Sequence, residues 1–75
     1  MFELRIREII SRTLDIPIEE LMDEADIVDD LGADSIEVLD LIFAIEKEFN
    51  IKITDEEVVK NRSVRNVIDF VLEKM

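Results

Sequence analysis

The spacing of apolar residues constrains the fold of this 75-residue chain more than any other feature, because apolar positions recur at steps of three and four. Such spacing places them on one face of a helix, and it is clear over residues 2–14. This segment is expected to end at Asp15, Ile16 and Pro17, because proline restricts the residue before it and can restart a helix only near its first turn. A short restart is expected at 17–21. No useful length alternates as a strand would, and the brief alternation over 50–54 indicates an extended connector.

Further helix starts are predicted from capping residues. The run 34–37 fits a capping box with Asp34 as the N-cap, and it opens a helix that runs to about residue 49. The run 54–57 repeats the box and opens a short helix toward Lys60. A last helix is capped by Ser63. Its apolar residues are Val64, Val67, Ile68, Val71 and Leu72.

The segment 15–34 is aperiodic and acidic, and it is longer than the four to six residues typical between helices. It either spans the bundle from end to end or has an additional role. The residues that would pin it are Leu21, Ile27, Val28 and Leu31. The expected fold is all-α, a small up-down bundle of three main helices plus one short helix, with this long loop between the first and second. Residues 1–75 are expected to form a single domain, because so short a chain buries only about 60% of its unfolded surface.

The composition limits the possible partners. The chain is 48% hydrophobic and 39% charged with one glycine and one proline, which is typical of a compact helical domain. Twenty acidic residues against nine basic ones give a net charge of −11, which disfavours nucleic acid and anionic membranes and favours a basic partner surface. No apolar run approaches the roughly 18 residues of a membrane span, and no signal-peptide pattern is present. We therefore expect a cytoplasmic monomer without membrane insertion.

Metal and redox chemistry are disfavoured by the absence of cysteine and histidine. Without them the chain has no disulfide or thiolate framework, and any metal site would be all-oxygen. The acidic loop fails the EF-hand spacing, because placing Gly32 at loop position six puts Ile27 at position one and Val38 at position twelve. No specific metal site is expected.

Ser35 is the candidate functional residue. It stands in the first turn of a predicted helix, where unpaired N–H groups and the helix dipole favour an attached phosphate. The chain lacks the usual bases and the strongest nucleophile, and Gly32 alone cannot make a nucleophile elbow or a phosphate loop. We therefore expect no catalytic residue and no enzyme activity, with Ser35 modified by another protein. The alternative is an acidic helical interaction or adaptor module without a prosthetic group, in which Ser35 is structural or phosphorylated.

The helix that starts at Ser35 has two apolar faces. One face is expected to line the core and holds Val38, Leu41, Ile42, Ile45 and Phe49. Opposite it, Ile36, Leu39 and Phe43 form a narrower strip bordered by charged residues. An exposed apolar strip rimmed with charge is typical of a protein contact surface. Alternatively the strip packs under the long loop, or only Leu39 turns inward.

The run Asp29-Asp30-Leu31-Gly32-Ala33-Asp34-Ser35 resembles the acyl carrier proteins. The resemblance covers nearly the whole chain and continues through Leu41, Ala44, Ile45, Glu46, Glu48, Phe49, Ile51, Ile53 and Asp55-Glu56-Glu57. It implies that Ser35 accepts a 4′-phosphopantetheine arm from coenzyme A through a magnesium-dependent phosphopantetheinyl transferase, the holo-acyl-carrier-protein synthase. The implied function is to carry acyl groups as thioesters between enzymes of fatty-acid or related acyl biosynthesis.

The resemblance also implies roles for residues around Ser35. The implied partners are acyl-processing enzymes with basic docking patches, such as ketoacyl synthases and acyltransferases. The implied contacts are the acidic Asp34, Glu37, Asp40 and Glu46 and the apolar Ile36 and Phe43. Similar proteins hold the acyl chain between their helices, and the candidate walls here are Val38, Ile42, Ile45, Phe49, Ile53 and Ile68. In the unloaded protein these walls are expected to be ordinary core, with a tunnel that opens on loading.

The chain departs from the usual pattern of this family at four positions, which are Ile36, Lys47, Asn50 and Thr54. Ile36 replaces a leucine, Asn50 a glycine and Thr54 a proline. Asn50 can adopt the left-handed conformation and Thr54 can cap a helix, so neither threatens the fold. Lys47 replaces an acid and reverses a charge on the docking face, so it is expected to change which enzymes are accepted.

Overall fold

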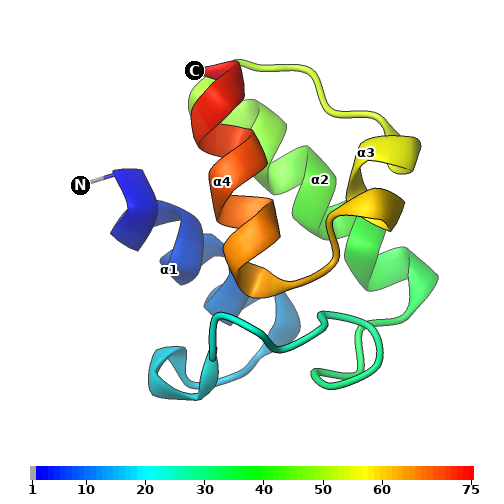
Figure 1. The fold of residues 1–75 in the computed structure, drawn as a ribbon. Helices are drawn as coiled ribbons and strands as arrows, with labels where there is room; N and C mark the ends of the chain where they lie inside the picture. Colours follow the sequence, from blue (N-terminus) through cyan, green and yellow to red (C-terminus); the bar gives the residue numbers. More distant parts are fainter. Residues whose placement is uncertain (1) are drawn as a thin grey trace.

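The structure is a computed structural model that describes residues 2–75, and this part of the chain is all-helical (Figure 1). Its elements are α1 (Phe2–Leu14), the 3₁₀ turn η1 (Ile18–Glu20), α2 (Ser35–Phe49), α3 (Asp55–Lys60) and α4 (Val64–Lys74). The predicted bundle of three main helices and one short helix is confirmed, with its long loop between α1 and α2. None of the described helices has the length and apolar character needed to cross a membrane.

The predicted capping residues begin α2, α3 and α4. The Asp34 carboxylate accepts the Glu37 N–H at 2.8 Å, and the Glu37 carboxylate accepts the Asp34 N–H at 3.1 Å. Thr54 and Glu57 form the same reciprocal box at α3, and the Ser63 hydroxyl accepts a backbone N–H at the start of α4. Each cap satisfies donors that the first turn of a helix leaves unpaired, so local sequence fixes where these helices begin.

Two helices end at residues in the left-handed conformation. Asn50 has a φ of 56° and closes α2 as expected. Asp15 follows α1, where the helix was expected to end, but its left-handed φ of 55° was not predicted. Asn and Asp tolerate this conformation better than other non-glycine residues, since their short polar side chains bond locally.

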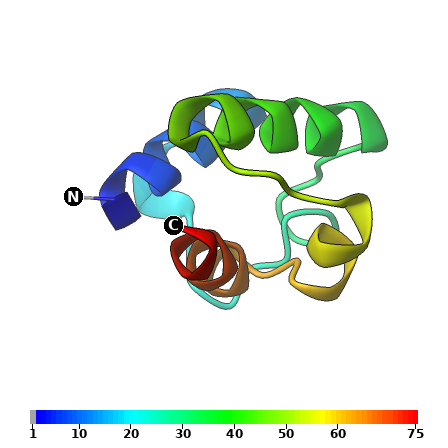
Figure 2. The ribbon, with the colours of Figure 1, turned by 90° about the horizontal axis from the view of Figure 1, so that it is seen from above.

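The core lies between α1, α2, α4 and the long loop. Its most deeply buried side chains are Ile6, Ile10, Ile27, Ile45, Ile68, Val64, Val67 and Val71. The four residues expected to hold the loop all pack on this core: Leu21 and Ile27 are buried, and Val28 and Leu31 are half-buried. Figure 2 shows α4 nearly end-on, with α2 crossing the opposite side of the molecule and α3 near the end where α2 begins.

Backbone hydrogen bonds tie the loop to the connection between α3 and α4. The Ile27 N–H donates to the Arg62 carbonyl at 2.9 Å, and the Val64 N–H donates to the Ala25 carbonyl at 2.9 Å. These contacts join segments far apart in the sequence, and no local pattern predicted them. They hold the loop below the start of α4, so the loop is a structural layer rather than a loose connection.

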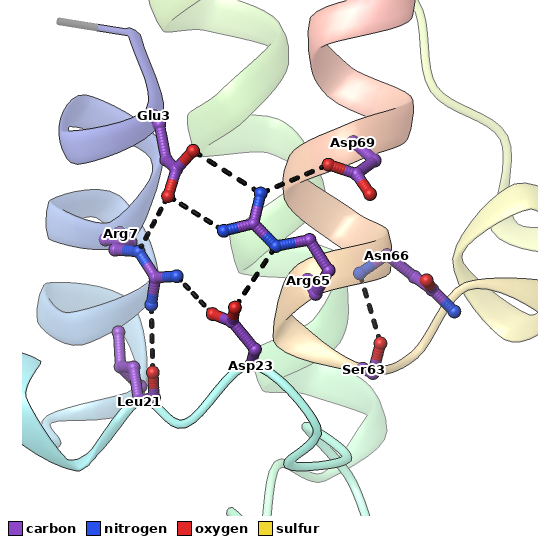
Figure 3. A network of polar contacts seen from close by, with 8 residues as sticks. All are labelled: Glu3, Arg7, Leu21, Asp23, Ser63, Arg65, Asn66 and Asp69. Atoms are coloured by element: carbon purple, nitrogen blue, oxygen red, sulfur yellow. Dashed lines mark hydrogen bonds and ion pairs between the residues drawn. The ribbon is translucent and has the colours of Figure 1, made fainter.

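A cluster of charged side chains joins α1, the loop and α4 (Figure 3). The Arg65 guanidinium pairs with Glu3 at 2.9 Å, Asp69 at 3.2 Å and Asp23 at 3.4 Å, and Arg7 also pairs with Asp23. Hydrogen bonding to Arg65 lowers the pKa of Glu3, and hydrogen bonding to Arg7 lowers the pKa of Asp23. Both carboxylates are therefore easier to protonate in the unfolded chain than in the folded one.

This cluster predicts a loss of stability in acid. Because the folded pKa values of Glu3 and Asp23 are lowered, their contribution is present above the ordinary carboxyl pKa of about 4 and is lost as the pH falls below it. Arg65→Gln removes the principal cause at Glu3, so the variant is expected to lose less stability between neutral and acid pH than the wild type. Urea unfolding of both proteins, at neutral pH and at a pH below about 4, measures how much free energy of unfolding each protein loses in acid. Equal losses would contradict the assignment.

Candidate functional site

Ser35 is the first residue of α2, and its side chain is exposed. Its hydroxyl forms no hydrogen bond with any residue in the described range 2–75. The other serines are engaged: the Ser11 hydroxyl donates to the Ile16 carbonyl at 2.6 Å, and the Ser63 hydroxyl caps α4. Ser35 therefore offers a free oxygen at the start of a 15-residue helix, where the helix dipole favours negative charge.

A cavity of about 360 Å³ lies beside Ser35, between α2, α3 and the loop. Its lining is mainly apolar and consists of Val28, Ala33, Ser35, Val38, Leu39, Asp55, Val58, Val59 and Arg62. A free hydroxyl at the edge of an apolar cavity suits the covalent attachment of a group that carries an apolar chain. The attachment point is in solvent, and the apolar chain can bind in the cavity close by.

The cavity overlaps little with the predicted acyl-chain walls. Val38 lines it, whereas the other predicted walls lie elsewhere in the fold. Ile42, Ile45, Ile53 and Ile68 are buried in the core. Phe49 lies at the far end of α2, where its ring packs edge-to-face on Phe2 with centroids 6.2 Å apart.

Several cavity residues were missed by the sequence analysis. Ala33 and Leu39 flank Ser35 closely in sequence, and the apolar pair Val58 and Val59 was a usable signal. The short helix α3 buries only Val58 in the core, whereas the side chain of Val59 remains 67% exposed. Arg62 carried no local signal, because the backbone contacts between the loop and the α3–α4 connection bring it to the cavity.

The apolar strip on α2 is exposed and does not pack under the loop. Ile36 is 68%, Phe43 61% and Leu39 41% exposed. Ile36 and Phe43 thus point outward, while Leu39 also contributes to the cavity. The three residues thus form an exposed apolar strip along α2.

The acidic residues predicted to border this strip differ in their availability. Asp34 and Asp40 are exposed. Glu37 is half-buried and occupied in the capping box, and the Glu46 carboxylate accepts the Ile53 N–H at 2.8 Å. Because the exposed Asp34 carboxylate also caps α2, three of the four carboxylates hold the local structure of α2 and its connector, and among them only Asp40 has no such role.

Lys47 gives the strip a basic end. It is exposed and continues the helical line of Ile36, Asp40 and Phe43 at steps of four, three and four. It also borders a cavity of about 490 Å³ between α1 and α2, which Arg12 lines from the other helix. The exposed line of α2 is thus acidic near Ser35 and ends in one basic residue, Lys47.

Known proteins match this site and this fold. The family described as "Phosphopantetheine attachment site" matches residues 4–71. An acyl carrier protein from Buchnera aphidicola subsp. Acyrthosiphon pisum (strain Tuc7) is 47% identical over 72 residues, covering 96% of this chain and 90% of that protein. The acyl carrier protein from Enterococcus faecalis has a similar structure, with a TM-score of 0.82 and 32% identity over 99% of this chain and 94% of that one. The chain therefore belongs to the acyl carrier protein family and carries acyl groups on a covalently attached 4′-phosphopantetheine.

Proposed function

We propose that Ser35 is the residue to which the phosphopantetheine is attached. Its free, exposed oxygen at the start of α2 carries this proposal. When bound, the group supplies a terminal thiol that holds the acyl chain as a thioester. Residues around Ser35 supply the rest: the start of α2 favours the phosphate charge, and the adjacent cavity offers the acyl chain an apolar surface.

The protein is a substrate of enzymes in this proposal and does not catalyse its own modification. No histidine or cysteine is available as a base or nucleophile, so a magnesium-dependent phosphopantetheinyl transferase activates the Ser35 hydroxyl. The chain then acts as a single cytoplasmic carrier domain that delivers acyl groups among enzymes of fatty-acid or related biosynthesis.

The exposed face of α2 is the proposed docking surface. Ile36 and Phe43 provide apolar contact, and Asp34 and Asp40 face basic patches on partners such as ketoacyl synthases and acyltransferases. Exposed ion pairs contribute about 0 to 1 kcal/mol each, so these charges guide association and orientation more than they add affinity. Weak and rapid binding suits a carrier that must leave each partner in turn.

The acyl chain is proposed to enter between α2 and α3. The cavity beside Ser35 gives its first contacts, with Val38 on the α2 side. Deeper entry would displace buried residues of the predicted wall such as Ile42 and Ile53, because a close-packed core has no spare volume. The tunnel would therefore open as the chain is loaded.

Intact mass tests the carrier function directly. The purified chain is incubated with coenzyme A, magnesium and a phosphopantetheinyl transferase, and its mass is then measured. We expect a gain of one phosphopantetheine per chain. The adaptor alternative predicts no gain with any of several transferases, since such a module needs no prosthetic group.

The basic end of the docking surface yields a prediction for partner choice. Lys47→Glu is expected to increase the rate of loading by a generic fatty-acid enzyme that presents a basic patch, because the whole exposed line of α2 then becomes acidic or apolar. Added salt is expected to reduce the gain, since charges on the surface are screened.

Lys52→Glu is the matched control for this experiment. Lys52 is also exposed, but it lies in the connector after α2 and off the docking strip. Both variants change the net charge equally, so a larger effect at Lys47 assigns the effect to the docking surface. An unchanged loading rate for Lys47→Glu would overturn the role given to this residue.

A further inference from the structure

Arg62 joins the connection between α3 and α4 to the long loop. Its Nε lies 3.0 Å from an Asp26 carboxylate oxygen, and its Nη2 lies 2.9 Å from an Asp29 carboxylate oxygen. Its backbone carbonyl accepts the Ile27 N–H at 2.9 Å. The same residue therefore holds the loop through its main chain and through both sides of its guanidinium.

The loop on the other side of these ion pairs is organised by Asp26. One oxygen of its carboxylate accepts the N–H of Val28 at 2.8 Å and that of Asp29 at 2.9 Å, and the other oxygen pairs with Arg62. Hydrogen bonding from the Asp29 and Val28 N–H groups, followed by Arg62, lowers the pKa of Asp26. The position of Val28 is thus set by the carboxylate that Arg62 holds.

The cavity beside Ser35 has a loop wall containing Val28 and an α3 wall containing Val58 and Val59. Arg62 lines the cavity where these two walls meet. A further ion pair, from Glu57 to Lys74 at 2.7 Å, ties α3 to the end of α4.

We infer that Arg62 is a latch for the cavity beside Ser35, which holds the loop wall and the α3 wall at a fixed separation and thereby controls how well an acyl chain is sheltered there. The inference deepens the proposed function, since it rests on Ser35 carrying the chain into this cavity. Arg62 acts as a positioning residue, because it shapes the walls and does not react with the cargo.

The test compares an acyl chain long enough to reach the walls of the cavity with one that is too short to reach them. Acetyl and octanoyl thioesters are prepared on the wild type and on Arg62→Gln, and their release by hydroxylamine is followed by intact mass. We expect Arg62→Gln to release the octanoyl group about two- to fivefold faster than the wild type, the effect of losing half-exposed ion pairs. Acetyl release should not change, because so short a group gains nothing from the walls.

Two further variants separate the latch from general stability and from the lining itself. Arg65→Gln breaks a comparable cluster that ties the loop to α4 away from the cavity, and it should leave both release rates unchanged. Asp29→Asn weakens the latch without altering a lining residue, and it should speed octanoyl release in the same direction as Arg62→Gln. An unchanged octanoyl rate in Arg62→Gln, or an equal increase in Arg65→Gln, would overturn the inference.

Amide hydrogen exchange of the unloaded proteins tests the latch without requiring that Ser35 carry any group. Amides of Val28 and Val58 should exchange faster in Arg62→Gln than in Arg65→Gln if the latch holds the two walls. Equal exchange in both variants would reject the latch whatever the state of Ser35. Failure of the wild type to be loaded at all would instead count against the proposed attachment at Ser35.

Discussion

Ser35→Ala is expected to abolish the mass increase that coenzyme A and a phosphopantetheinyl transferase produce in the wild type. The substitution removes the free hydroxyl at the start of α2, and no other serine in residues 2–75 offers an unengaged oxygen there. The fold should survive, because Ser35 is exposed and the cap of α2 is the neighbouring Asp34. The free energy of unfolding should change by no more than about 0.5 kcal/mol.

Ser63→Ala and Ser11→Ala are the controls for this result. Both should still gain one phosphopantetheine, although Ser63→Ala removes the cap of α4 and should cost about 0.5 to 2 kcal/mol of stability. Intact mass and urea unfolding of the three variants separate lost modification from lost fold. A Ser35→Ala protein that still gains the group would contradict the assignment of this residue.

Ile68→Ala is expected to reduce the free energy of unfolding by about 2 to 5 kcal/mol. Ile68 lies on α4 and is 0% exposed, so truncation leaves a cavity in the core as well as losing buried apolar surface. Small domains are stable by only about 5 to 15 kcal/mol, so this one change removes a large share. Urea unfolding measures the effect.

Ile36→Ala makes the same chemical change on the exposed strip of α2. Its side chain is 68% exposed, so the free energy of unfolding should shift by no more than about 0.5 kcal/mol, while transfer to a partner enzyme slows. The two variants thus separate the two apolar faces of this protein. Equal destabilisation by Ile36→Ala and Ile68→Ala would show that the strip belongs to the core.

Features fixed by neighbouring residues were predictable from the sequence. Asp34, Thr54 and Ser63 cap their helices by bonding groups only three residues away, so the starts of α2, α3 and α4 follow from local chemistry. The place of Ser35 in the first turn of α2 follows from the same local chemistry, because Asp34 immediately before it is the cap. The end of α1 shows the limit of such local prediction, because several residues near Asp15 could have ended this helix.

Features that depend on contacts distant in sequence were not predictable. Arg62 reaches the cavity because the loop bonds to the α3–α4 connection, and nothing near Arg62 in the sequence indicates Asp26 as its partner. For a related reason, the sequence did not show which carboxylates on α2 are already engaged in hydrogen bonds. Composition shows that Glu46 is acidic, but only the fold shows that it accepts the Ile53 N–H.

The central claim is that the phosphopantetheine is attached to the free oxygen at the start of α2. Fragmentation mass spectrometry of the protein purified from its native host tests this claim most directly, because it places the added group on a single residue and also reveals the acyl cargo. We predict the group on Ser35. The same group on Ser11, Ser63 or either threonine, with Ser35 unmodified, would contradict the account.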